Sequence, residues 1–175
     1  YEYHKQELSA FCHFGPNTFN EIEWGEHYGS RTPDQIFTLE DDFDAELLVS
    51  TLKSAGFKKL IVTAKHHDGF CIWNSKWTTY DVESTSYAGY DYDGLGGDVL
   101  AEISAACTKY DMDMGLYLSP WDIHEPSYGY YDANGNITID EDAAFQDIQR
   151  AAQAENILRS AVRSLKNVNS MCSEF

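Results

Sequence analysis

The sequence predicts an α/β fold built on a parallel sheet, and two observations carry this prediction. Residues 59–64 form a compact, partly β-branched apolar run, which is typical of a strand covered on both faces. Shorter strand-like runs lie near residues 8–12 and 114–118, and helical patterns separate the three runs. Strand, helix, strand, helix, strand is the order of a parallel sheet with crossover helices.

The two helices are predicted from their ends as well as from their apolar spacing. Asp44 is placed to cap the first helix, and Gly56 is placed to end it. Its expected apolar face consists of Ala45, Leu47, Leu48, Leu52 and Ala55. The second helix is expected from about Asp98 to Tyr110. Its expected apolar face consists of Val99, Leu100, Ile103, Ala106 and Cys107.

The chain is strongly acidic. Its 175 residues include 12 Lys and Arg against 29 Asp and Glu, which gives a net charge of -17. Such a surface repels phosphate backbones and anionic lipid, so we expect no nucleic acid and no membrane as a partner. No apolar run approaches the ~20 residues of a membrane span. The four cysteines lack metal-ligand spacing, and we expect buried free thiols at Cys12, Cys71, Cys107 and Cys172.

Polar side chains stand at the end of each predicted strand. His13 follows the first strand, His66, His67 and Asp68 follow the second, and Tyr117 lies at the end of the third. Barrels of parallel strands hold their active sites at the carboxyl ends of the strands. We therefore expect these side chains to converge on one functional site.

Two long segments follow the first and second strands, at residues 17–43 and 71–97. Both are rich in aromatic residues, and loops of this length are often functional, so we expect them to cover a pocket. Glu23 and Trp24, in the first segment, would add a hydrogen-bond acceptor and an apolar platform.

The adjacent His66 and His67 allow two interpretations. Zinc and iron sites more often use His-x-His or His-x3-His, and neighbouring residues of a strand point to opposite faces unless the strand has already ended. Each imidazole can also donate and accept hydrogen bonds, which suits a polyhydroxylated ligand. We therefore predict that the two histidines bind hydroxyl groups, with no metal and no cofactor.

Four segments follow one another in a distinctive order: His13-Phe14-Gly15, Glu23-Trp24, His66-His67-Asp68-Gly69-Phe70 with Trp73 close behind, and Tyr117-Leu118-Ser119-Pro120-Trp121-Asp122. Together, over roughly residues 8–132, they resemble glycoside hydrolase family 29, the α-L-fucosidases. The resemblance implies the N-terminal portion of a (β/α)8 TIM-type barrel and a retaining mechanism through a covalent fucosyl-enzyme. The Ser119-to-His124 segment is similar to the subgroup that prefers branched α-1,3 and α-1,4 linkages.

The resemblance also implies roles for individual residues. His13, His66 and His67 would hold the hydroxyl groups of fucose together with Glu23. Trp24 would line the pocket, and Tyr117 would lie close to the nucleophile. The partner implied is a fucosylated oligosaccharide or glycoconjugate.

The sequence departs from the family at the catalytic carboxylates. The nucleophile of the family is an aspartate in a Trp-x-Asp-like segment at the end of the fourth strand, and no tryptophan follows Trp121 here. Retaining hydrolysis needs two carboxyl groups about 5 to 5.5 Å apart. The sequence identifies neither the nucleophile nor the acid/base residue, and Asp68 and Asp122 are the alternative carboxylates.

Size leads to the same expectation. Barrels of this kind take about 250 residues, and the predicted strand ends leave room for about half of the strands. We expect residues 1–142 to form an incomplete barrel and residues 143–175 a tail with helical spacing from Ala143 to Leu165. The chain is accordingly expected to be a fragment or a truncated product that does not hydrolyse an aryl α-L-fucoside alone.

Three functions follow from these observations. Hydrolysis of terminal α-L-fucosyl linkages is the leading interpretation. A non-catalytic domain that binds fucose or another sugar is the second, and a metal-dependent hydrolase is the third. Members of the family are often secreted, periplasmic or lysosomal, and the residues themselves indicate no compartment.

Overall fold

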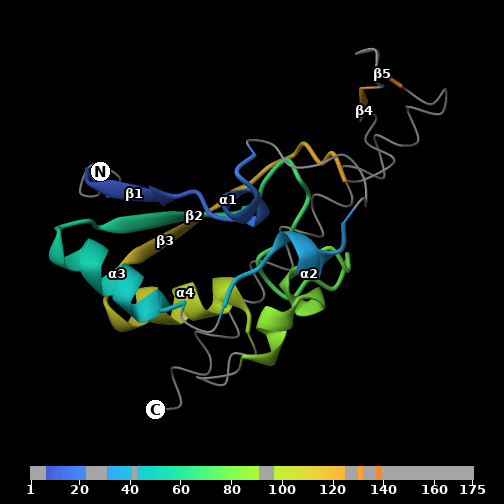
Figure 1. Ribbon diagram of the computed structural model, residues 1–175. Helices are drawn as coiled ribbons and strands as arrows, with labels where there is room; N and C mark the ends of the chain where they lie inside the picture. Colours follow the sequence, from blue (N-terminus) through green and yellow to red (C-terminus); the bar gives the residue numbers. More distant parts are fainter. Residues whose placement is uncertain are drawn as a thin grey trace.

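The computed structural model describes residues 7–22, 31–40, 43–90 and 97–124, and the backbone of two short strands beyond them. Within these ranges the chain is an α/β unit with a three-stranded sheet in the order β1-β2-β3 (Figure 1). These strands are β1 (Ser9–Cys12), β2 (Lys59–Lys65) and β3 (Asp113–Leu118). Both neighbouring pairs are parallel, which confirms the predicted α/β class and the predicted strand positions.

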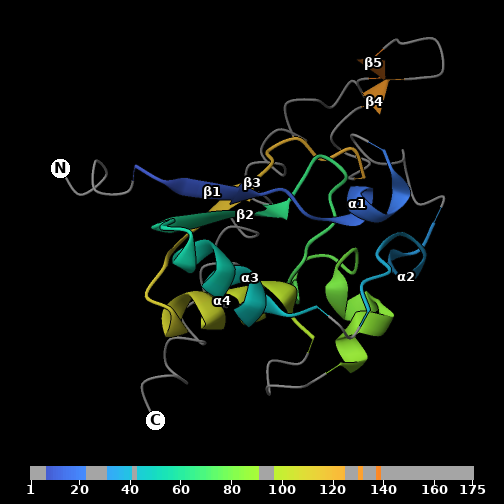
Figure 2. The same cartoon turned by 60° about the vertical axis from the view of Figure 1, so that its left-hand side comes forward.

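Two helices cross over between the strands and lie on one face of the sheet (Figures 1 and 2). α3 (Ala45–Ser54) connects β1 to β2, and α4 (Val99–Lys109) connects β2 to β3. Each begins at the aspartate predicted to cap it, because Asp44 accepts a hydrogen bond from the Leu47 N–H and Asp98 from the Ala101 N–H. These bonds satisfy backbone donors that the first turn of a helix leaves unpaired.

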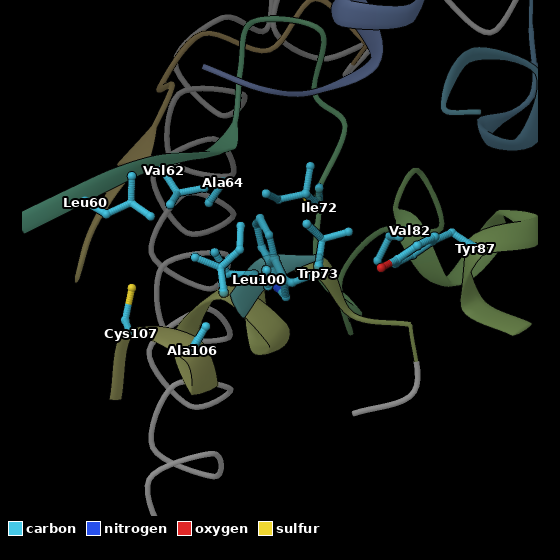
Figure 3. Close-up of a cluster of buried hydrophobic side chains, with 14 of the residues drawn as sticks. Leu60, Val62, Ala64, Ile72, Trp73, Val82, Tyr87, Leu100, Ala106 and Cys107 are labelled. Atoms are coloured by element: carbon cyan, nitrogen blue, oxygen red, sulfur yellow. The ribbon is translucent and has the colours of Figure 1, made fainter. Parts of the chain in front are cut away.

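The core lies between the sheet and these helices (Figure 3). Leu60, Val62 and Ala64 occupy alternate positions of β2 and are fully buried in one cluster with residues of α4. The predicted apolar face of α4 is buried throughout. The prediction for α3 is wrong at Ala55, which is exposed. It is also wrong at Leu47, which is 63% exposed, whereas Val49 is fully buried. Residues two positions apart on a helix point to nearly opposite sides, so only one of the two can face the core.

The opposite face of the sheet is less covered than the sequence predicts. Phe11 on β1 is 55% exposed, and Ile61 on β2 is half-buried. Thr63 and Lys65, at the carboxyl end of β2, are buried. The predicted burial of both faces of β2 is therefore confirmed at its carboxyl end, which carries the predicted site. The prediction is wrong at the beginning of β2.

The segment that follows β2 packs into the core instead of only covering a pocket. Trp73 is fully buried and Tyr87 is 3% exposed, and both belong to the core cluster. Two 3-10 helices that the sequence does not predict shape this segment, η2 (Val82–Ser84) and η3 (Ser86–Gly89). The segment after β1 likewise contains two unpredicted short helices, α1 (Pro16–Asn20) and α2 (Pro33–Ile36).

Beyond the sheet, β4 (Tyr130–Tyr131) pairs with β5 (Ile137–Thr138) in antiparallel orientation. The described cysteines are free; Cys71 and Cys107 are buried as expected, and Cys12 is half-buried. Cys172 and the helix expected from Ala143 to Leu165 lie outside the described residues. None of the helices described is long and apolar enough to span a bilayer.

Candidate functional site

The carboxyl ends of the three strands bring four of the predicted site residues together. His13 directly follows β1, His66 and His67 directly follow β2, and Tyr117 lies near the end of β3. The centroid of the His66 ring lies 4.6 Å from that of His13, 4.1 Å from that of His67 and 6.0 Å from that of Tyr117. His66 is thus the centre of a four-ring group from three strands, here called the histidine cluster. The predicted convergence of the strand ends is confirmed.

A β-bulge immediately before the cluster explains why two adjacent histidines lie side by side. Thr63 pairs with Tyr117 and Lys65 with Leu118, so Ala64 is an extra residue between these pairs. The Ala64 carbonyl instead accepts a hydrogen bond from the Ile72 N–H. Because β2 ends at Lys65, the alternation of a strand does not extend to the two histidines. The expectation that neighbouring histidines diverge is therefore wrong.

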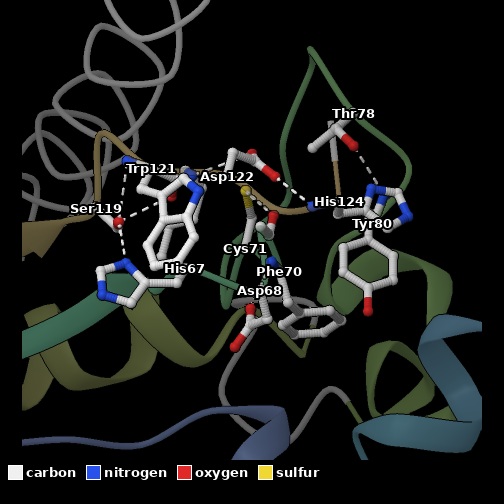
Figure 4. A network of polar contacts seen from close by, with 12 residues as sticks. His67, Asp68, Phe70, Cys71, Thr78, Tyr80, Ser119, Trp121, Asp122 and His124 are labelled. Carbon is white, nitrogen blue, oxygen red and sulfur yellow. Dashed lines mark hydrogen bonds and ion pairs between the residues drawn. The ribbon is translucent and has the colours of Figure 1, made fainter. Parts of the chain in front are cut away.

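Hydroxyl groups of neighbouring strands anchor two of the three imidazoles. The Nδ1 atom of His13 lies 3.0 Å from Thr63 Oγ1 on β2. The Nδ1 atom of His67 lies 2.6 Å from Oγ of Ser119, which follows β3 (Figure 4). The Nδ1 atom of His66 is buried and has no hydrogen-bond partner among the described residues. The contact of His13 with Thr63 thus links the end of β1 to β2, and the contact of His67 with Ser119 links the end of β2 to the loop after β3.

Burial and neighbouring positive charges favour the neutral forms of His66 and His67. The pKa of His66 falls to about 4, first because of burial and then because of His67, His13 and Lys65. The pKa of His67 is also lowered, by burial and then by Lys65 and His13. A neutral imidazole has one N–H donor and one acceptor nitrogen. At neutral pH His66 therefore has one donor and one acceptor nitrogen, and because Nδ1 is buried, the tautomer decides whether Nε2 donates or accepts.

A pocket of about 230 Å³ opens beside the cluster, between the loop after β1 and the turn after β2. This volume lies below the roughly 300–1,000 Å³ of sites for drug-sized ligands, so the pocket suits a small ligand. Apolar and polar side chains share its wall, which consists of His13, Phe14, Gly15, Asn17, Thr18, Ile22, His66 and Asp68.

Asp68 lines this pocket, but both of its oxygens are engaged. Oδ2 accepts from Asn17 Nδ2 at 2.9 Å, and Oδ1 accepts from the Phe70 N–H at 2.8 Å. The residue is 3% exposed, and burial raises its pKa to about 6 although the Phe70 N–H acts in the opposite direction. These bonds make Asp68 a link between α1 and the turn after β2, and they leave it poorly prepared to act as a nucleophile.

Asp122, the other alternative carboxylate, forms an ion pair with Lys65. Their charged atoms lie 3.1 Å apart, and the side chains are 14% and 4% exposed. Asp122 Oδ1 also accepts from the His124 N–H. Gly69 has a φ of 81°, and a Cβ atom at this position would collide with the Asp122 carboxylate. Only glycine therefore allows the turn after β2 to approach the loop after β3 this closely.

Residues to which the sequence assigns no role in the site support the cluster. Thr63 and Ser119 hold histidines, and the Trp121 ring lies 4.9 Å from that of His67. A serine two positions before Trp121 is a signal for a turn closed by its side chain, and this signal could have identified Ser119. Glu23 and Trp24 lie outside the described residues.

The described residues contain no group of three or more His, Cys, Asp or Glu side chains arranged to hold a metal ion. The His66 and His67 rings, which are tilted by 33° to each other, form part of an aromatic group with Tyr117.

Comparisons with known proteins agree on one family. A profile of the family described as Alpha-L-fucosidase matches residues 2–160. The chain is 44% identical over 122 residues to Alpha-L-fucosidase 1 of Arabidopsis thaliana, covering 70% of this chain and 22% of that protein. It is 32% identical over 88 residues to Alpha-L-fucosidase of Dictyostelium discoideum, covering 49% of this chain and 17% of that protein.

Among solved structures, a Ruminococcus gnavus GH29 fucosidase in complex with fucose is similar at 64% identity. Its TM-score is 0.69, and the match covers 85% of this chain and 30% of that one. An alpha-L-fucosidase GH29 from Bacteroides thetaiotaomicron is 28% identical with a TM-score of 0.69, covering 93% of this chain and 38% of that one. The chain thus spans between about a fifth and two fifths of the length of these relatives.

Proposed function

This chain belongs to the α-L-fucosidase family, and from this premise we propose that it forms the fucose-recognising part of a glycoside hydrolase. The reaction proposed is the hydrolysis of terminal α-L-fucosyl linkages in oligosaccharides or glycoconjugates. The histidine cluster is the observation that carries the proposal, because three imidazoles from two strand ends group together and two of them, His13 and His66, line a small pocket.

The chemistry of the cluster supports a neutral, hydroxyl-rich ligand. The lowered pKa values of His66 and His67 favour uncharged rings that donate and accept, and fucose offers hydroxyl groups that do the same. The net charge of -17 would repel an anionic ligand and leaves a neutral sugar unaffected. The proposal assigns the sugar hydroxyls to His13, His66 and His67.

The remaining assignments follow the family. Glu23 is proposed to bind a sugar hydroxyl, Trp24 to line the pocket, and Tyr117 to lie close to the nucleophile. We also propose that the three parallel strands are the N-terminal portion of a (β/α)8 barrel, to which residues 1–142 contribute. The exposed Phe11 and the half-buried Ile61 support this proposal, since they lie on a sheet face that a closed barrel would bury.

The catalytic step proposed is retaining hydrolysis through a covalent fucosyl-enzyme, with one carboxylate as nucleophile and another as acid/base. The described residues contribute recognition and orientation to this step. Asp68 accepts two hydrogen bonds and Asp122 is paired with Lys65, so neither is assigned the nucleophilic role.

Hydrolysis of an aryl α-L-fucoside by the complete barrel to which these strands are proposed to belong tests the proposal, since the chain alone is expected not to hydrolyse it. We expect fucose to be released with retained anomeric configuration, as followed by NMR. We expect His67→Ala to lower kcat/KM by about tenfold or more, because a hydrogen bond to the sugar is lost. The β-L-fucoside serves as the control and should remain intact. Binding of fucose without hydrolysis would favour the non-catalytic alternative, and hydrolysis that is unaffected by His67→Ala would contradict the assigned site.

A further inference from the structure

Ser119 makes three contacts with its single hydroxyl group, and these contacts determine where its hydrogen lies. Its Oγ atom lies 2.6 Å from His67 Nδ1, 2.8 Å from the Trp121 carbonyl oxygen and 3.1 Å from the Trp121 nitrogen (Figure 4). A serine hydroxyl has one hydrogen to donate and two lone pairs to accept with.

Only one arrangement of hydrogens satisfies all three contacts. The Trp121 carbonyl oxygen can only accept, so the hydroxyl hydrogen must point to it. The Trp121 N–H can only donate, so it uses one lone pair of Oγ. The second lone pair then faces His67 Nδ1, which must carry a hydrogen. If the hydroxyl hydrogen pointed to Nδ1 instead, two oxygen atoms would face each other at 2.8 Å without a hydrogen between them.

We propose that Ser119 is a positioning residue that holds His67 in its Nδ1–H tautomer, so that Nε2 presents a lone pair to a hydroxyl group of the substrate. The tautomer assignment follows from the protein alone, and its last step, the substrate hydroxyl, rests on the proposed function. His67 would then act as a hydrogen-bond acceptor toward the sugar.

The surroundings of Ser119 make this arrangement rigid. The residue is 3% exposed, and its N–H donates to the Lys65 carbonyl at 2.9 Å. The Ile123 N–H donates to the His67 carbonyl at 2.8 Å. Both the serine and the histidine are thus fixed by backbone bonds between the loop after β3 and the turn after β2. Supporting bonds of this kind set the tautomer of a histidine and the direction of its ring.

The other two histidines differ from His67 in this respect. Thr63 Oγ1 contacts His13 Nδ1, but within the described part of the chain no second acceptor fixes the hydroxyl hydrogen. His66 Nδ1 has no hydrogen-bond partner among the described residues. The inference therefore applies to His67, where the neighbouring groups select one tautomer.

A long-range proton–nitrogen NMR spectrum of the native protein with ¹⁵N-labelled histidine tests the tautomer without any ligand. The His67 signals are identified by their loss in His67→Gln. We expect a protonated Nδ1 and an unprotonated Nε2. A protonated Nε2 on neutral His67 would overturn the proposal, whatever the protein binds.

Variants extend the test to the ligand. Ser119→Ala should shift His67 toward the Nε2–H tautomer and weaken binding of α-L-fucose by about tenfold. Ser119→Thr keeps the hydroxyl group and should therefore restore both the Nδ1–H tautomer and the affinity for fucose. Ser75→Ala is a matched control, because Ser75 Oγ accepts from the Trp77 N–H in a similar turn and should affect neither measurement. If Ser119→Ala does not fold, the proton–nitrogen NMR spectrum of the native protein alone tests the tautomer of His67. An Nδ1–H tautomer in a protein that binds no fucose would contradict the proposed function and leave the positioning role intact.

Discussion

At the scale of single residues, the pocket wall combines two groups whose pKa values are shifted toward their neutral forms. His66 has its pKa lowered from 6.5 to about 4, and Asp68 has its pKa raised from 3.8 to about 6. Burial is the largest cause of both shifts, because it disfavours any charge. Near pH 5 both groups are therefore mainly uncharged in the folded protein, whereas both are mainly charged in the unfolded chain.

The two shifts predict opposite effects of pH on the free energy of unfolding. The contribution of His66 is present above its unfolded pKa of 6.5 and is lost as the pH falls through about 4. The contribution of Asp68 is present below its unfolded pKa of 3.8 and is lost as the pH rises through about 6. We expect Asp68→Asn to make stability rise more steeply between pH 4 and 6, and His66→Gln to make it rise less or fall. Urea unfolding at several pH values measures these slopes, and identical slopes in all three proteins would refute the shifts.

At the scale of elements, the sequence predicts those parts of the fold that local chemistry determines. The periodicity of β2, the caps Asp44 and Asp98, and the turn residues after each strand are local signals, and all three strands and both crossover helices are confirmed. The short α1 and α2 and the 3-10 helices are not predicted, because a single turn gains its stability from tertiary contacts. The contact of Ser119 with His67 is missed for a similar reason, since it depends on how two strand ends approach each other.

The two helix caps differ in burial, and this difference predicts different effects on stability. Asp98 is 5% exposed and accepts from the Ala101 N–H and also from the Asn74 N–H, which belongs to another segment. Asp44 is exposed and accepts a hydrogen bond from the Leu47 N–H. We expect Asp44→Ala to lower the free energy of unfolding by about 1 kcal/mol and Asp98→Ala by about 2 to 3 kcal/mol, because the latter also leaves the Asn74 N–H unpaired.

Chemical denaturation of both variants beside the native protein measures these losses. Asp98→Asn is the conservative control, because its amide oxygen still accepts one of the two bonds. Equal losses for Asp44→Ala and Asp98→Ala would show that the contact with Asn74 contributes nothing.

At the scale of the whole molecule, the site and the core lie on different parts of the sheet. The candidate site lies at the carboxyl ends of the strands, and the core lies against one face. Helices α3 and α4 cover one face (Figure 1), and the strand ends carry the histidine cluster. The position of His13, His66, His67 and Tyr117 at one end is predictable from sequence, because parallel strands all end on the same side. The catalytic carboxylates are not identified from sequence, because no tryptophan follows Trp121 and the alternatives Asp68 and Asp122 are both engaged by other groups in the structure.

Calorimetric binding of α-L-fucose to the native protein and to His13→Ala, His66→Ala and His124→Ala tests the central claim most directly. His124 is the matched control, since its ring stacks on Tyr80 outside the histidine cluster. The account predicts that the native protein binds fucose, that His13→Ala and His66→Ala each weaken binding by about tenfold, and that His124→Ala does not change it. Unchanged affinity in the two cluster variants, or an equal loss in all three, would contradict the assignment of the histidine cluster as the fucose site.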